Sequence, residues 1–231
     1  MVGSRGWWLS TEVSSNGKPL QEAVLSSDLK TVVATWPWNS FGTPRFLPDS
    51  SGFVTQKNSI LFIAKVLDGK MKPLGPMPAK GRLLGFDSAG DLLVANDAIH
   101  QGNPGEHVTI TAMDLSKLRG VATYTVSVPY IPSEDLYPMP TLSPAGDRLR
   151  WDFLCSERRP ILSWIDQINY YAGQSAVWHT VYVTDLRGNN LQNLGTVRFP
   201  RGHELLNARW RPDGRSFSYV DGNHVYVVPV N

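Results

Sequence analysis

Short apolar runs separated by turn signals recur along the whole chain. A clear example is the run at 216–220, followed by Asp-Gly-Asn and a second run at 224–228. Runs of about five residues that are rich in Val and aromatic residues, bounded by Gly, Pro, Asp or Asn, predict β-strands. The pattern therefore predicts an all-β fold made of short antiparallel strands.

One of these turns recurs four times. The clearest copy is Trp-Arg-Pro-Asp-Gly-Arg at 210–215. The segment 142–147 repeats it, 46–52 repeats it with one residue inserted, and 86–91 lacks the proline. Pro fixes φ in a tight turn, Asp accepts a hydrogen bond from its own backbone, and Gly permits positive φ. An internal repeat of this kind indicates a solenoid, a propeller or an array of units.

The repeated unit consists of a strand, a Pro-Asp-Gly turn, a strand, a loop, a strand, an Asp-x-x-Gly turn and a strand. Four antiparallel strands of about five residues make up a propeller blade. The sequence therefore predicts one β-propeller domain over residues 1–231, with about four to five four-stranded antiparallel blades. The predicted units are 41–80, 81–136 and 137–203, with partial units at 1–40 and 204–231.

The repeats resemble the TolB-type, WD-like β-propeller repeat. The likeness rests on the Ser-Pro-Asp-Gly type of turn and on Val-Tyr-Val-x-Asp-x-x-Gly with a final Leu, present at 181–194, and it covers roughly residues 41–231. It implies the propeller fold and leaves function to particular sites. TolB-like relatives are often periplasmic, whereas the first residues here form neither a signal peptide nor a membrane span. The compartment is therefore undetermined.

The two ends of the chain carry incomplete units. Residues 7–20 fit a third strand, a turn and a fourth strand. Alternatively, residues 24–35 fit a degenerate first turn and a second strand. Residues 225–230 supply a third strand with no fourth strand after it. Either an N-terminal strand completes a small ring, or the chain is part of a larger one. In the second case, unpaired strand edges predict edge-to-edge oligomers.

Charge and motifs exclude several functions. The net charge of +2 gives no steering toward nucleic acid, and Cys155 is alone. The sequence contains no Gly-x-Ser-x-Gly, no Gly-rich phosphate loop and no His or Cys pair at metal-ligand spacing. We therefore predict a non-catalytic protein-binding scaffold without a cofactor or metal. The alternatives are a propeller domain of a larger enzyme, such as a prolyl oligopeptidase-type peptidase, and a ligand-binding propeller.

The loop predicted between the second and third strands is longest in the 137–203 unit, where it spans 156–179. The apolar spacing predicts a short amphipathic helix within 160–172, which either covers the propeller or forms the lip of a binding face. Long aromatic loops in compact domains are usually functional, and Trp and Tyr are enriched at contact hot spots. We expect a protein or peptide partner here. The predicted contact residues are Arg158, Arg159, Trp164, Tyr170, Tyr171, Trp178 and His179.

Overall fold

In the described residues the regular structure is built from antiparallel sheets, as the sequence predicted. The computed structural model describes residues 8–13, 16, 18–26, 28–37, 44–67, 69–77, 80–96, 107–128, 140–158, 174–199, 208–221 and 223–230. Within them every regular element is a β-strand, and the strands form five sheets in which each strand pairs with its neighbours along the chain. The chain divides into two compact units, Met1–Asp97 with Ile110–Thr123 and Ala98–Thr109 with Tyr124–Asn231.

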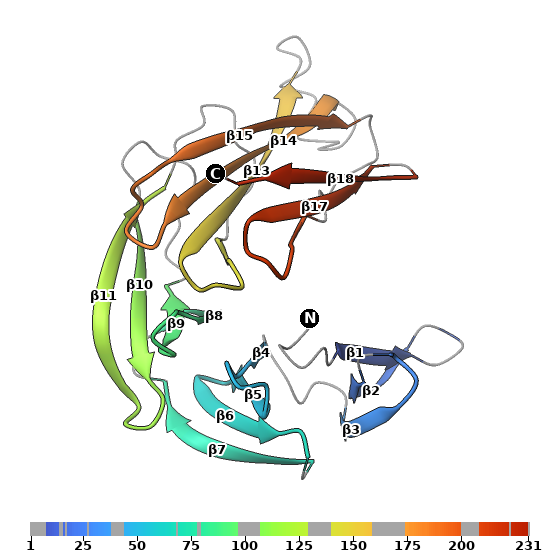
Figure 1. Cartoon of the computed structure of the whole chain (residues 1–231), viewed down its shortest axis with the longest axis vertical. Helices are drawn as coiled ribbons and strands as arrows, with labels where there is room; N and C mark the ends of the chain where they lie inside the picture. The colour runs from blue at the N-terminus through green and yellow to red at the C-terminus, as the bar shows by residue number, and fades with distance from the viewer. Residues whose placement is uncertain are drawn as a thin grey trace. The chain divides into compact units, whose positions relative to one another are not determined.

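The first unit contains two complete sheets and most of a third (Figure 1). The first sheet consists of β1 (Trp8–Val13), β2 (Pro19–Leu25) and β3 (Val32–Pro37). The second consists of β4 (Arg45–Phe46), β5 (Gly52–Lys57), β6 (Ile60–Lys65) and β7 (Lys70–Pro76). The third consists of β8 (Arg82–Phe86), β9 (Leu92–Ala95), β10 (His107–Asp114) and β11 (Arg119–Ser127), the last two of which continue into the second unit.

The second unit contains two further sheets. One consists of β12 (Thr141–Leu142), β13 (Arg148–Arg158), β14 (Gln174–Asp185) and β15 (Gln192–Phe199). The other consists of β16 (Arg209–Trp210), β17 (Ser216–Asp221) and β18 (His224–Pro229). The prediction that the last unit has a third strand without a fourth is confirmed for the described residues.

Apolar side chains fill the spaces between neighbouring sheets of each unit. In the first unit, Trp36 of β3 meets Phe53 of β5 edge to face, with ring centroids 5.3 Å apart. In the second unit, Phe217 of β17 packs against Val181 and Val183 of β14. Because alternate residues of a strand face opposite sides, each sheet can contribute to two such layers. This is the packing expected of blades.

Three of the four predicted turns share one hydrogen-bond pattern. In the copies that begin at Leu47, Ser143 and Arg211, the first N–H donates to the carbonyl five residues later, and its own carbonyl accepts from the N–H three residues later. In the copy that begins at Asp87, the first N–H donates to the carbonyl of Asp91, four residues later instead of five. The position with positive φ is occupied by Gly90, Gly146 and Gly214 in three of the copies. The turn chemistry predicted from sequence is thus confirmed.

The predicted insertion in the 46–52 copy is wrong. Ser50, with φ of 55°, occupies the position of the glycine, and the turn has the same length as those at Ser143 and Arg211. Gly52 instead begins β5, where a Cβ atom would lie 2.1 Å from the carbonyl oxygen of Ala64. This glycine is therefore required by the close approach of β6 and not by the turn.

A fifth turn of the same kind joins β2 to β3. The N–H of Ser26 donates to the carbonyl of Thr31, and the N–H of Leu29 donates to the carbonyl of Ser26. Leu29 has φ of 61°, and Asp28 accepts a hydrogen bond from the N–H of Lys30. The turn predicted near residue 28 is therefore present. β1 and β2 pair as the two neighbouring strands predicted for residues 7–20, but the prediction that the second of them is a fourth, outermost strand is wrong, because β3 pairs with the other edge of β2.

Candidate functional site

The hairpin of β13 and β14 is the longest in the described structure (Figure 1, yellow and orange). These strands have 11 and 12 residues, whereas the corresponding β5 and β6 have 6 each. The pairing runs from Arg148 opposite Asp185 to Arg158 opposite Gln174, while β15 ends with Phe199 opposite Val177. We call residues 154–158 and 174–179 the ribbon. Among the described residues, its tip extends past the last β15 pair as two paired strands with no third strand beside them.

The structure shortens the loop predicted at 156–179. Residues 156–158 belong to β13 and residues 174–179 to β14, so the predicted loop bounds are wrong at both ends. The reason is that strand pairing continues as long as both strands find partners, and Trp178 pairs with Cys155 on one side and Arg198 on the other. The predicted helix at 160–172 lies outside the described residues.

The predicted contact residues divide into three groups. Arg158 and Trp178 are strand residues of the ribbon. His179 lies in β14 opposite Leu154 and is only 4% exposed, so its imidazole belongs to the interior and offers little surface to a partner. The remaining predicted residues lie outside the described part of the chain; they are Arg159, Trp164, Tyr170 and Tyr171.

The ribbon extends from a densely packed part of the same strands, residues 151–153 of β13 and 180–182 of β14, which we call its base. Trp151 and Phe153 of β13 are fully buried, and Phe153 meets Tyr182 of β14 edge to face with ring centroids 5.6 Å apart. On β14, the hydroxyl of Thr180 lies 3.0 Å from that of Thr196 on β15. Aromatic packing and buried hydrogen bonds of this kind restrict side-chain motion. The base therefore holds the ribbon in a defined direction.

A buried ion pair lies beside this base and was not predicted from the sequence. Nη2 of Arg150 is 2.6 Å from Oδ2 of Asp152, two residues along the same strand face, and the guanidinium lies 5.6 Å from the ring centroid of Phe217. Arg150 is 4% exposed, and its Nε and Nη1 have no hydrogen-bond partner within the described structure. The Arg-x-Asp spacing could have predicted this ion pair, because residues i and i+2 of a strand lie on the same face.

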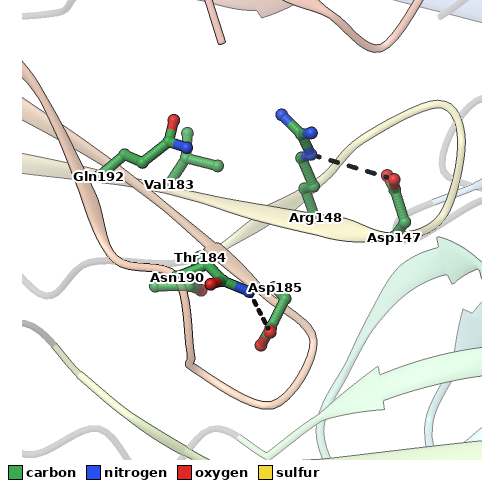
Figure 2. Close-up of a pocket in the computed structure, with 7 residues that line it drawn as sticks. All are labelled: Asp147, Arg148, Val183, Thr184, Asp185, Asn190 and Gln192. Atoms are coloured by element: carbon green, nitrogen blue, oxygen red, sulfur yellow. Dashed lines mark hydrogen bonds and ion pairs between the residues drawn. The ribbon is translucent and has the colours of Figure 1, made fainter. Parts of the chain in front are cut away.

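A polar pocket of about 370 Å³ lies at the opposite end of the same sheet (Figure 2). Asp147 and Arg148 come from the end of the β12–β13 turn and the start of β13. Asp185 and Asn190 come from the end of β14 and the turn that follows. The full lining comprises Asp147, Arg148, Val183, Thr184, Asp185, Asn190 and Gln192.

The carboxylates of this pocket stabilise turns. Asp185 accepts hydrogen bonds from the N–H groups of Arg187 and Asn189, both at 2.8 Å, and from Nδ2 of Asn190 at 3.1 Å. Asp147 accepts from the hydroxyl of Ser143 at 2.8 Å. The pocket is therefore explained as the space between two hydrogen-bonded turns. In the described residues there is no cluster of three or more His, Cys, Asp or Glu side chains that could hold a metal ion.

No helix of the described part of the chain is long and apolar enough to span a membrane. No protein-family model matches the chain, and no curated protein is significantly similar to it.

Several solved structures are nevertheless similar to it. The structure of putative TolB from Agrobacterium tumefaciens aligns over 97% of this chain and 72% of its own, with a TM-score of 0.50 and 16% identity. TolB from Acinetobacter baumannii aligns over 90% of this chain with a TM-score of 0.48 and 13% identity. Acylaminoacyl peptidase from Pyrococcus horikoshii aligns over 96% with a TM-score of 0.44 and 10% identity.

The sheets, their shared turns and the likeness to the Agrobacterium structure define a TolB-type β-propeller fold. The resemblance predicted from the repeats is thus confirmed at the level of fold. The chain spans 45% of the Acinetobacter TolB chain and 36% of the peptidase chain. A shared fold at this identity carries no function with it.

Proposed function

We propose that this propeller is a non-catalytic scaffold that binds a protein or peptide through the ribbon and the segment 159–173 that it holds. The observation that carries the proposal is the length of β13 and β14, 11 and 12 residues, on a packed base. A rigid support lowers the entropy lost on binding because the contact residues are already oriented. Function on repeat scaffolds is typically placed in one elaborated loop of this kind.

The proposed roles follow from side-chain chemistry. Trp and Tyr combine a large apolar area with a hydrogen-bonding group and few rotatable bonds, so they serve as anchors in contact hot spots. Arg158 and Arg159 form the polar rim, and His179 supports the ribbon from within. The proposed anchors are Trp164, Tyr170, Tyr171 and Trp178.

The experiment replaces residues 159–173 by Asn-Gly, which closes a two-residue hairpin between antiparallel strands. Because Arg158 and Gln174 are already paired, the shortened chain should keep its circular dichroism spectrum. Peptides selected from a random library on the intact chain should lose binding in calorimetry. Arg187→Ala, at the far end of the same sheet, is the control and should bind them unchanged.

Two results would contradict the proposal. If the selected peptides bind the shortened chain as tightly as the intact one, the ribbon segment is not the binding site. If the shortened chain unfolds, the segment is needed for packing, as in the interpretation of the predicted helix as a cover.

A further inference from the structure

The connection between β1 and β2 carries an asparagine that is followed by glycine. Asn16 is exposed, and its Oδ1 accepts a hydrogen bond of 3.3 Å from the N–H of Lys18. A short asparagine side chain bonded in this way to the residue two positions later lies close to the peptide bond that it spans. Asn16-Gly17 is also the one Asn-Gly pair in the sequence.

We propose that Asn16 is a site of spontaneous deamidation in the folded protein. The peptide nitrogen of Gly17 attacks Cγ of Asn16, and the bond from Cγ to Nδ2 breaks. Ammonia leaves with the proton that the peptide nitrogen gives up. Water then opens the five-membered succinimide ring at one of its two carbonyl groups, which yields aspartate or isoaspartate. The proposal is independent of the ribbon.

Two features of this connection favour the reaction. As the nitrogen attacks, negative charge develops on Oδ1 of Asn16, and a donor already directed at that oxygen stabilises the charge. The N–H of Lys18 is such a donor. Glycine has no Cβ, so Gly17 neither shields its own nitrogen nor restricts the backbone angles that ring closure requires.

Asn193 isolates the effect of the glycine. It is exposed and accepts the same kind of hydrogen bond, 2.9 Å from the N–H of Gly195. The residue that follows it is Leu194, whose branched side chain hinders the approach of the peptide nitrogen. Asn193 is therefore expected to keep its amide under conditions in which Asn16 loses it.

Asp213 shows how a turn can protect a residue that precedes glycine. Asp213 accepts a hydrogen bond of 2.9 Å from the N–H of Arg215. The N–H of Gly214, however, donates to the carbonyl of Arg211 at 3.0 Å, so the nitrogen that would attack is held in the turn. Its carboxylate is also a weaker electrophile than an amide. We therefore expect Asp213 to stay unchanged.

The product changes charge and, for isoaspartate, main-chain length. A carboxylate two residues from Lys18 replaces a neutral amide, and isoaspartate adds one methylene group to the main chain. The nearest β1–β2 pair, Val13 with Pro19, lies beside a register shift between Glu12 and Val13, so the ladder is already irregular at this end. The modified chain should therefore keep its fold.

The test incubates the full folded chain at neutral and alkaline pH and follows residue 16 by peptide mapping with tandem mass spectrometry. Residue 16 should lose the mass of ammonia and gain that of water, at a rate that rises with hydroxide concentration, while Asn193 stays unchanged. The chain unfolded in urea is the reference, and its rate at residue 16 should be similar because Asn16 is exposed in the folded state. If residue 16 converts in urea and stays intact in the folded chain, the proposal is wrong.

Variants test the two features separately. Gly17→Ala should slow the conversion several-fold in the folded chain. Lys18→Pro removes the N–H donor and should slow it as well, whereas Lys18→Ala keeps the donor and should leave the rate unchanged. Circular dichroism should show the variants folded. A Gly17→Ala chain that converts as fast as the native chain overturns the proposal, and equal rates in the two Lys18 variants overturn the role of the hydrogen bond.

Discussion

Nε1 of Trp151 donates a hydrogen bond of 3.0 Å to the hydroxyl of Thr184, across the hairpin of β13 and β14. Trp151 is fully buried and Thr184 is 1% exposed. An indole buried without a partner would lose the hydrogen bond that it makes to water in the unfolded chain. This pair therefore fixes the strand that carries the ribbon to its neighbour.

Thr184→Val should lower the free energy of unfolding by ~1–3 kcal/mol, because it keeps the shape of the side chain but leaves the indole N–H buried and unpaired. Chemical denaturation measures the loss. Thr125→Val, at an exposed position of β11, is the control and should change stability by less than ~0.5 kcal/mol. Equal effects of the two substitutions would show that the hydrogen bond contributes little.

Asp152→Ala should destabilise the protein more than Arg150→Met does. Removing the carboxylate leaves the buried guanidinium without its counter-charge. Because the Asp152 side chain is 24% exposed, the free energy of unfolding should fall by an amount at the lower end of ~3–5 kcal/mol. Methionine in place of Arg150 removes the more deeply buried charge and keeps apolar contact with Phe217. It leaves the Asp152 carboxylate, which is 24% exposed to water, so the loss should be smaller. The midpoints of urea denaturation give the order, and the reverse order would contradict it.

Gly52→Ala should cost more than ~1 kcal/mol, because the new Cβ would lie 2.1 Å from the carbonyl oxygen of Ala64 and the two strands must separate. In Gly120→Ala the nearest atom is Cγ2 of Thr111 at 3.3 Å, a side-chain atom that can move, so the loss should be smaller. Thermal melts of the two variants provide the comparison. Similar melting temperatures would contradict the requirement for glycine at the start of β5.

The pKa of Asp114 is lowered from 3.8 to about 2 by hydrogen bonds from the Ser116 hydroxyl, from Lys117 and from the Ser116 N–H. Because the folded pKa lies below the unfolded one, the stabilisation is complete above about pH 4 and is lost as pH falls toward about 2. Ser116→Ala should raise the pKa of Asp114, as followed by NMR of its carboxyl carbon. Asp28, whose pKa is lowered by Ser26, should titrate unchanged.

Sequence predicted the turns well because their signals are local. Pro144 and Pro212 restrict their own φ, and Gly146 and Gly214 mark the positive-φ position directly. The same reasoning gave the wrong residue at Ser50. Serine rarely adopts positive φ, so the sequence did not mark this position, and the positive-φ position was assigned to the nearby Gly52 instead. Local residue type predicts a turn only where the residue is the one that the turn prefers.

The candidate site was less predictable because strand ends depend on partners far along the chain. Residues 174–179 contain no residue type that marks the boundary between a loop and a strand. They form a strand because they pair with β13 and β15. The burial of His179 follows from that pairing and not from its residue type. The aromatic residues between Arg158 and Gln174 remain a prediction.

The order of the strands within each sheet has a consequence for the rate of folding. Every pairing in the described structure joins strands that are consecutive in the sequence. Such local contacts lower the contact order, and the entropy of closing a loop grows only slowly with its length. Each sheet can therefore form as soon as its own segment is available. The β13–β14 hairpin must close a 15-residue segment, 159–173, before its ribbon pairs, so we expect it to form later than the β5–β6 and β17–β18 hairpins.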